Sequence, residues 1–240
     1  MHPFYYFDKV FIINLPSRAD RRREMGQQLR LIGLGLEAPI IELFPAVRPG
    51  DRGEFDSVGA RGCFMSHRSV LQKAAEMGYS RIVILEDDVN FISGFPHYLS
   101  GVVESLASQH WDLFYGGYRV ADERDLRPGI PVYPPERGVL LAHFVAFQSP
   151  AIQMAAAYLD TLLSRPGGDP RGGPMHVDGA YTWLRRTHPE LTTRLTVPQL
   201  GYQRASRTDI HPLRWFDRFT GTRQLTAAMR VLKNLARRNG

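Results

Sequence analysis

The hydrophobic pattern of the first half of the chain alternates between short continuous apolar runs and longer stretches with helical periodicity. Apolar runs of strand length occupy residues 9–15, 39–46 and 81–85. Continuous runs of this length are typical of strands that are covered on both faces. Between them, apolar side chains recur at helical spacing within residues 16–34 and 63–77, so the pattern predicts two helices there.

Local signals suggest where these elements begin and end. Ser17 and Asp20 have the spacing of a capping box, which favours a helix start at this point. Glycines at 33–35 and at Gly78 are expected to end the two helices. The polar, glycine-rich residues 48–62 predict a loop.

The second half of the chain continues the alternation with a longer loop in the middle. Pro150 stands where the first turn of a helix is expected, a position that favours proline. The expected elements are a helix at 97–107, a strand at 111–116, a loop at 119–137, a strand at 138–148, a helix at 150–165, a glycine- and proline-rich loop at 166–174 and a short helix at 177–186.

Strand, helix, strand, helix, strand in this order predicts an α/β fold with a Rossmann-like, mostly parallel sheet flanked by helices. Ligands of such sheets bind beyond the carboxyl ends of the strands. Functional side chains are therefore expected directly after the apolar runs.

Three adjacent carboxylates, Glu86, Asp87 and Asp88, follow the apolar run at 81–85. They repel one another, and at the end of a buried strand they are costly unless a cation or hydrogen-bond donors compensate them. Carboxylate oxygens suit Mg²⁺ or Mn²⁺, which can in turn neutralise a diphosphate. The alternative is that the cluster caps a helix or pairs with nearby arginines.

Polar residues also follow the first apolar run. Asn14 and Arg18 stand where a ligand would be received, and arginine can bind phosphate bidentately. For at least two of Arg21, Arg22 and Arg23, a solvated helix face is the simpler interpretation.

His67 lies on the apolar stripe of the helix at 63–77, near the end that should face the same edge of the sheet. A buried, hydrogen-bonded core histidine is the common explanation for such a position. The single cysteine, Cys63, excludes an internal disulfide framework and a multi-cysteine zinc site, and we expect it to be a small core residue.

Length and composition fit one large globular domain, at residues 1–213, followed by a tail at 214–240, because 240 residues with 43% hydrophobic content can bury a sizeable core. The net charge of +6 is concentrated at the carboxyl end. Residues 204–240 hold nine Arg or Lys and two Asp, a balance of +7, whereas the rest of the chain holds 21 basic and 22 acidic residues.

Within this basic tail, apolar residues recur at helical spacing among the cations, which predicts an amphipathic helical tail. Such a helix can bind an anionic membrane surface or dock on the protein's own core. No nucleic-acid recognition motif accompanies the basic residues, so we expect no nucleic-acid partner. The sequence has no apolar run of 18 residues and no secretory signal pattern at its amino end, which favours a cytoplasmic location.

Four sequence blocks occur in an order that resembles a known family. The blocks are "FIINLPSRADRR", "GCFMSHRSVLQKA", "RIVILEDDV" and "WDLFYGG", with looser likeness in "HVDGAYTWL", "VPQLGYQ" and "RTDI". They resemble glycosyltransferase family 25, a group of lipooligosaccharide and lipopolysaccharide sugar transferases that includes collagen galactosyltransferases. The resemblance implies a GT-A fold, a nucleotide-sugar donor such as UDP-galactose, a divalent cation and inversion at the anomeric carbon.

The resemblance also implies roles for the acidic cluster. "EDD" is similar to the Asp-X-Asp motif of GT-A enzymes, with glutamate in the first place. Asp88 is then the expected metal ligand, Glu86 contacts the ribose, the metal or its water, and Asp87 supports the donor-binding loop. The cation would be Mn²⁺ or Mg²⁺.

For the other residues, the resemblance implies that Asn14 and Arg18 receive the base and ribose, and that Ser66 and His67 contact the donor side of the pocket. Asp178 is the expected base that takes a proton from the acceptor, although a helix N-cap is the alternative. A late histidine binds metal in many GT-A enzymes, which makes His211 a further candidate ligand.

Together these expectations describe a metal-dependent inverting glycosyltransferase. It would move a hexose, with galactose as the expected sugar, from a UDP-sugar to a hydroxyl of a lipopolysaccharide-type or other glycan acceptor, at the inner face of a bacterial membrane. The alternative is a nucleotide-sugar-binding protein that has lost transfer activity.

Overall fold

The apolar runs of the sequence form a central six-stranded sheet in the computed structural model, which describes residues 1–204. Four consecutive residues of the third run, Ile82 to Leu85, have no exposed surface, as expected for a strand covered on both faces. The strands are β1 (Lys9–Asn14), β2 (Ile41–Pro45), β3 (Arg81–Glu86), β5 (Leu113–Arg119), β6 (Leu140–Gln148) and β7 (Thr193–Leu195).

The strand order is β2-β1-β3-β6-β5-β7. The pairs β1–β2, β1–β3 and β5–β7 are parallel, whereas β6 runs antiparallel to both of its neighbours. The predicted α/β class with a mostly parallel sheet is therefore confirmed. A second sheet pairs β4 (Val89–Phe91) with β8 (Gly201–Gln203) in antiparallel fashion.

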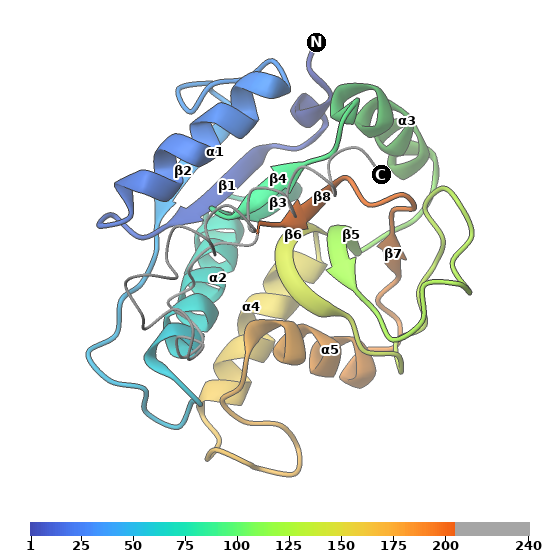
Figure 1. Ribbon diagram of the computed structural model, residues 1–240. Coiled ribbons are helices and arrows are strands. Elements are labelled where there is room, and N and C mark those ends of the chain that lie inside the picture. Colours follow the sequence, from blue (N-terminus) through green and yellow to red (C-terminus); the bar gives the residue numbers. More distant parts are fainter. Residues whose placement is uncertain (205–240) are drawn as a thin grey trace, which may run out of the picture.

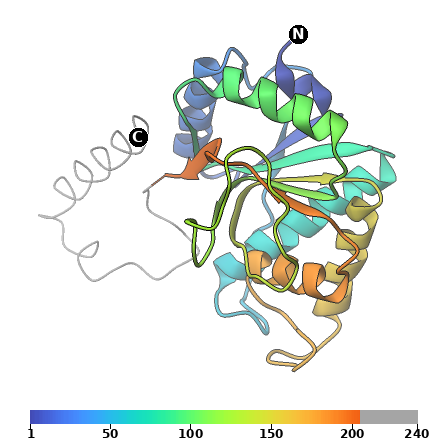
Figure 2. The same cartoon turned by 90° about the vertical axis from the view of Figure 1, so that its right-hand side faces the viewer.

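Helices cover both faces of the large sheet (Figure 1). The 3-10 helix η1 (Pro3–Tyr6), α1 (Ala19–Leu31) and α3 (Phe95–Ser108) pack on one face. The helices α2 (Val58–Glu76), α4 (Ala151–Leu163) and α5 (Val177–Thr187) pack on the other. Figure 2 shows the sheet between these two helical layers. Each face has its own hydrophobic core.

The helix α2 begins five residues earlier than the sequence pattern predicts. Ser57 is its N-cap and accepts a hydrogen bond from the backbone N–H of Ala60. The first turns contain glycines, which hide helical periodicity in the sequence. One of them has a packing reason: a Cβ at Gly62 would lie 2.7 Å from the carbonyl oxygen of Val47. A side chain at Gly62 would push the helix away from the segment after β2.

The start of α1 also differs from the prediction. The N-cap is Arg18, and it makes no side-chain capping bond, so the capping box of Ser17 and Asp20 does not form. The carboxylate of Asp20 instead binds the guanidinium of Arg18 at 2.8 Å. The strands β4, β7 and β8 were not predicted, because three residues are too few to show a period of two.

The predicted domain boundary at residue 213 and the amphipathic tail at 214–240 lie outside the described residues. None of the helices between residues 1 and 204 combines the length and the apolar character that crossing a bilayer requires.

Candidate active site

A cavity of about 500 Å³ opens at the carboxyl ends of β1 and β3, the edge where ligands were expected. Its walls come from the segments that follow β1 and β2, from the first turns of α2, and from the end of β3. We call the three carboxylates there, Glu86, Asp87 and Asp88, the acidic turn. Its lining residues include Leu15, Arg18, Arg21, Val47, Pro49, Gly59, Gly62, Cys63, Ser66, Glu86 and Asp87. The cavity size is within the range of small-molecule sites.

The carboxylate of Asp87 is compensated by two side chains from the β1–α1 segment. Asn14 donates its amide N–H to Oδ2 at 2.7 Å, and Arg21 donates to Oδ1 at 2.8 Å. All three residues are largely buried, with the side chain of Arg21 11% exposed and that of Asp87 8% exposed. The pair holds α1 against the acidic turn, and Arg21 is therefore not part of a solvated helix face.

The carboxylate of Asp88 is compensated much less. Its Oδ1 is buried and has no hydrogen-bond partner among residues 1–204, while Oδ2 accepts a long bond of 3.3 Å from Gln203. Arg21 lies 3.7 Å away. Burial, followed by the charge of Glu86, raises the pKa of Asp88 to about 7. Asp88 is thus a buried carboxylate, one oxygen of which has no hydrogen-bond partner in the described part of the chain, and it lies beside the cavity rather than among the residues that line it.

Glu86 faces α2 rather than α1. Its Oε1 lies 3.4 Å from Nε2 of His67 and 3.6 Å from Sγ of Cys63. Burial acts to raise the pKa of Glu86, but the hydrogen bond and charge of His67 outweigh it, so this pKa lies below its ordinary value. The side chain is 15% exposed and lines the cavity.

Ser66 and His67 lie beside the cavity, but their polar atoms are engaged within the protein. Ser66 Oγ donates to the carbonyl oxygen of Gly62 and accepts from the N–H of Val47. His67 is fully buried, and its Nδ1 lies 3.1 Å from the hydroxyl of Tyr181. The core-histidine alternative thus describes its packing, while its contact with Glu86 brings it to the acidic turn.

Asn14 is more deeply buried in the protein than Arg18. Asn14 is 2% exposed, and its amide bonds Asp87 and the carbonyl oxygen of Arg18. Arg18 lines the cavity with a side chain that is 21% exposed. Of these two, Arg18 is the residue placed to reach a ligand directly.

Asp178 is in the first turn of α5, but the N-cap of this helix is His176, so Asp178 is not the N-cap. Its Oδ2 accepts a 2.9 Å hydrogen bond from the N–H of Leu141, the residue at which β6 adopts φ 70°. Non-glycine residues rarely adopt this conformation. The charge of Asp178 also acts on the thiol of Cys63, which places it near the Glu86 side of the site.

Several residues near the acidic turn were not predicted individually. Arg204 donates to the carbonyl oxygen of Asp87 and pairs with Glu24, and Gln203 reaches Asp88. Tyr181 and His143 lie near Glu86, the latter 1% exposed and with neither ring nitrogen bonded within the described chain. Burial lowers the pKa of His143, opposed by the charge of Glu86. In the sequence, "VPQLGYQ" contains Gln203 and "HVDGAYTWL" contains Tyr181, whereas Arg204 and His143 lie outside the blocks that resemble the family.

The acidic turn fits a divalent cation in one specific respect. Asp88 has a buried oxygen without a hydrogen-bond partner among the described residues, and a cation there would relieve the cost of its charge. Its ligand atoms are hard oxygens, which Mg²⁺ and Mn²⁺ prefer. Asp87 fits less well because both of its oxygens are already bonded. His211 lies outside the described residues.

Comparison with known proteins agrees with this arrangement. Residues 7–122 match the model of glycosyltransferase family 25, described as an LPS biosynthesis protein. This region contains β1, α2, β3 and the acidic turn. Over these residues, slightly less than half of the chain, the protein is similar to glycosyltransferase family 25.

Among curated relatives, a probable inactive glycosyltransferase 25 family member 3 of Rattus norvegicus is 33% identical over 129 residues, covering 46% of this chain and 23% of the relative. Procollagen galactosyltransferase 1 of Danio rerio is 29% identical over 155 residues. The match covers 57% of this chain and 24% of the relative. The chain therefore spans about a quarter of the length of these relatives.

Among solved structures, one that aligns is a glycosyltransferase involved in the glycosylation of the major capsid of PBCV-1. The alignment covers 83% of this chain and 93% of the chain in that structure. The TM-score is 0.49 and the sequence identity is 10%.

Proposed function

We propose that this protein is a metal-dependent, inverting glycosyltransferase that moves a hexose, galactose in particular, from a UDP-sugar to a hydroxyl of a lipopolysaccharide-type glycan. Three findings support the proposal: the match of residues 7–122 to the family 25 model, the cavity at the carboxyl ends of β1 and β3, and the acidic turn beside it. Relatives named procollagen galactosyltransferases make galactose the first sugar to test.

The observation that carries the proposal is the buried Oδ1 of Asp88, which has no hydrogen-bond partner within the part of the chain that the structure describes. A protein that needed only packing at this position would lower its cost with an apolar or neutral side chain. Asp88 would hold Mn²⁺ or Mg²⁺, with Glu86 as a second oxygen ligand or as the contact to metal-bound water or ribose. When bound, such a cation neutralises the charge that develops on the leaving diphosphate.

The chain's own residues would then bind and orient the donor. Arg18 lines the cavity and would contact the ribose or a phosphate, while Asn14 and Arg21 fix Asp87 so that the turn keeps its shape. Ser66 and His67 would set the wall of the donor pocket through their bonds to Val47 and Glu86.

Transfer requires a base on the acceptor side. Asp178 would take the proton of the acceptor hydroxyl as its oxygen forms a bond to the anomeric carbon and the bond from that carbon to the diphosphate oxygen breaks. UDP leaves with the electron pair of the broken bond, and attack from the opposite side inverts the anomeric centre. Asp178 comes from α5, a different element from the metal-binding turn.

A second candidate function is nucleotide-sugar binding without transfer. It is favoured by one observation: several relatives that match this chain are named inactive or probable inactive family members. Such a protein would keep the acidic turn and the cavity but would not need Asp178.

The proposal also includes a location for the protein in the cell. The excess of basic residues at 204–240 would hold the protein on the anionic inner face of a bacterial membrane, where a glycolipid acceptor is anchored. Salt-sensitive binding to anionic vesicles, but not to DNA, is expected of the full chain.

The experiment that tests the function is a screen of nucleotide sugars for thermal stabilisation and hydrolysis, with and without Mn²⁺. Stabilisation by UDP-galactose together with Mn²⁺-dependent hydrolysis supports a transferase. Stabilisation without hydrolysis, and without transfer to any glycan, supports the binding protein. If no nucleotide sugar stabilises the protein under any of these conditions, both proposals are wrong.

A further inference from the structure

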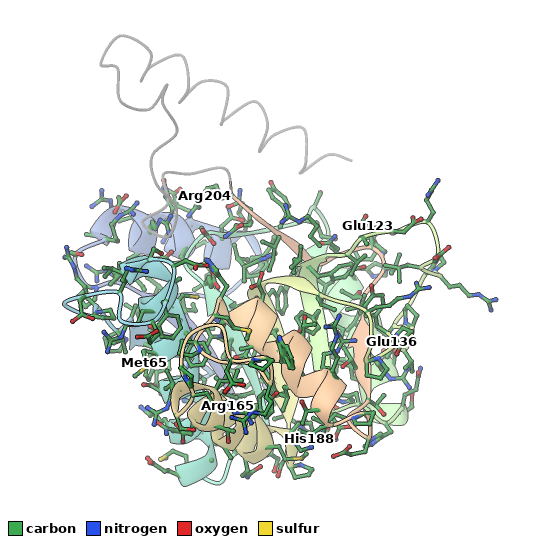
Figure 3. All side chains as sticks on the ribbon, turned by 90° about the horizontal axis from the view of Figure 1, so that it is seen from below. Met65, Glu123, Glu136, Arg165, His188 and Arg204 are labelled. Carbon is green, nitrogen blue, oxygen red and sulfur yellow. The ribbon has the colours of Figure 1, made fainter. Side chains whose placement is uncertain are left out.

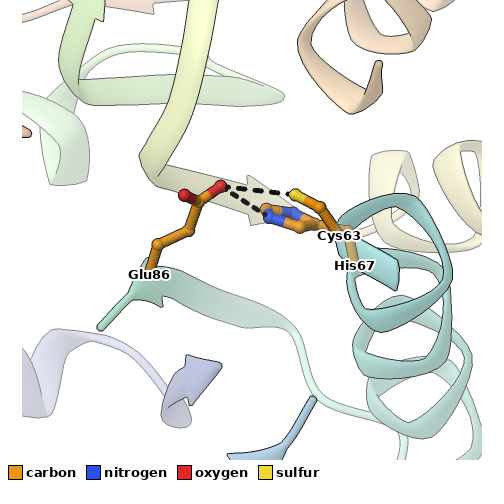
Figure 4. Close-up of side chains that lie close together, drawn as sticks. All are labelled: Cys63, His67 and Glu86. Atoms are coloured by element: carbon orange, nitrogen blue, oxygen red, sulfur yellow. Dashed lines mark hydrogen bonds and ion pairs between the residues drawn. The ribbon is translucent and has the colours of Figure 1, made fainter. Parts of the chain in front are cut away.

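Three potential metal ligands of different chemistry converge beside the cavity (Figure 4). Cys63 and His67 are four residues apart on α2, so one turn of helix brings them to the same face. Glu86 reaches them from the end of β3. The nearest ligand atoms of the three side chains all lie within 4.8 Å of one another.

The two distances from Glu86 to the other side chains match those between the ligands of a tetrahedral zinc ion, and the remaining distance, from His67 to Cys63, is within 4.8 Å. Zinc binds oxygen and nitrogen at about 2.0 Å and sulfur at about 2.3 Å, so tetrahedral geometry separates oxygen from nitrogen by about 3.3 Å and oxygen from sulfur by about 3.5 Å. In the protein, Oε1 of Glu86 lies 3.4 Å from Nε2 of His67 and 3.6 Å from Sγ of Cys63.

The surroundings also resemble those of a metal site. Nδ1 of His67 lies 3.1 Å from the hydroxyl of Tyr181, an outer partner of the kind that orients metal-binding histidines. With a metal on Nε2, Nδ1–H would donate to the Tyr181 oxygen. The local charge is negative, because Glu86 and Asp178 both act on the thiol of Cys63.

The cavity would let a metal ion reach the three side chains and would leave room for a fourth ligand on it. Cys63 and Glu86 both line it, whereas His67 is fully buried behind them. A cation held by the three side chains would therefore keep one position toward the cavity, as in zinc sites with three protein ligands and an exchangeable water.

We propose that Cys63, His67 and Glu86 form a three-ligand site for a thiophilic divalent cation, Zn²⁺ first of all, with its fourth position open to the cavity. As the sulfur–metal bond forms, the thiol proton is released to solvent, because the thiolate is the metal ligand.

This site is chemically distinct from the one proposed at Asp88. Sulfur and imidazole ligands favour zinc, whereas the oxygens of the acidic turn favour Mg²⁺ or Mn²⁺. Glu86 is the only side chain that the two proposals share. The zinc proposal does not depend on transferase activity, since its test needs no nucleotide, sugar or acceptor.

The test uses Co²⁺ as a spectroscopic substitute for Zn²⁺ in the full-length chain. Thiolate bound to Co²⁺ gives a charge-transfer band in the near ultraviolet, and the sequence contains one cysteine, so such a band can come only from Cys63. We expect the band to appear on titration with Co²⁺ and to disappear when Zn²⁺ is added. Absence of the band in folded wild-type protein at saturating Co²⁺ overturns the proposal.

Variants then test the other ligands. Cys63→Ser should lose the band completely, and Glu86→Gln and His67→Gln should each weaken Co²⁺ binding by about tenfold or more. Tyr181→Phe removes an outer partner and should weaken binding by roughly 10- to 100-fold. If the band keeps wild-type intensity and affinity in both Glu86→Gln and His67→Gln, the cysteine binds alone and the three-ligand site is wrong.

Two measurements keep the test decisive. Because His67 is fully buried, circular dichroism first establishes that each variant is folded, and zinc-edge X-ray absorption of wild-type protein counts one sulfur beside nitrogen and oxygen ligands. A first coordination shell of zinc that contains no sulfur overturns the proposal even if every buried variant unfolds.

The matched control is His188→Ala. It alters a half-exposed histidine that pairs with Glu190 on the side of the molecule opposite Arg204 (Figure 3), and it should leave the band unchanged.

Discussion

Arg21 donates a charged hydrogen bond of 2.8 Å to Asp87, and both side chains are almost completely buried. This bond joins the first helix to the turn after β3. It explains how adjacent carboxylates are tolerated: one is bonded to arginine and asparagine, and another faces histidine. Within residues 1–204, the third, Asp88, accepts a long bond from Gln203 and lies 3.7 Å from Arg21, so it is the least compensated of the three carboxylates.

The Arg21–Asp87 pair should be important for stability. Arg21→Met leaves a buried carboxylate without its cation and is expected to lower the free energy of unfolding by about 3 kcal/mol. Urea denaturation measures this change. The control is Arg23→Met, on the exposed face of the same helix, which should change stability by less than about 0.5 kcal/mol. Equal effects of the two variants would show that the buried pair is not stabilising.

The charge of Asp88 should make stability depend on pH. The folded protein keeps a proton on this carboxyl up to about pH 7, whereas the ordinary pKa is 3.8. Between these values the folded state binds more protons than the unfolded state, so the free energy of unfolding should fall as pH rises. Asp88→Asn removes this contribution.

The measurement compares urea denaturation of wild-type protein and Asp88→Asn near pH 4.5 and near pH 7.5, with a chelator present. The wild type should lose about 2–4 kcal/mol relative to the variant over this range, since one pKa unit corresponds to about 1.4 kcal/mol. Parallel pH profiles of the two proteins would contradict the raised pKa of Asp88.

Gly62 should tolerate no side chain, because a Cβ there would meet the carbonyl oxygen of Val47 at 2.7 Å. Gly62→Ala is expected to destabilise the protein by about 1–3 kcal/mol through overpacking. Gly101, within α3, has open space at the same atom, and Gly101→Ala should stabilise the protein by about 0.5–1 kcal/mol. Thermal unfolding of both variants tests whether the two changes in stability have opposite signs. Destabilisation by both substitutions would contradict the packing argument.

Asp178→Asn should separate catalysis from donor binding. The asparagine oxygen can still accept the hydrogen bond from Leu141, so the local structure should persist. A base role predicts that the transfer rate falls by about 10² to 10⁴-fold while the affinity for UDP-sugar stays near the wild-type value. A parallel loss of donor affinity would make Asp178 part of the donor pocket instead.

Hydrophobic patterning was enough to predict the main strands and helices of this fold, because residues 10–14 and 82–85 are buried and carry a strong signal. It failed where local signals were weak or misleading. The start of α2 was hidden by Gly59 and Gly62, and the three-residue strands were too short to show periodicity.

Within the candidate site, the acidic cluster was visible in the sequence, but the partner of each carboxylate was not. That Asp87 faces Arg21 whereas Glu86 faces His67 depends on the direction of each side chain at the turn, which spacing does not determine. His143 gave no signal, because a histidine within an apolar strand shows nothing of what lies across the sheet. Its proximity to Glu86 comes from the antiparallel pairing of β3 with β6.

The central claim is that Asp88 holds a divalent cation that binds the diphosphate of the donor. Isothermal titration calorimetry of UDP binding, with Mn²⁺ and with chelator, tests it most directly in wild-type protein and in Asp88→Ala. Wild-type protein should bind UDP with Mn²⁺ and at least about tenfold more weakly without it, and Asp88→Ala should lose this dependence on the cation. Mn²⁺-dependent binding that survives in Asp88→Ala would contradict the assignment.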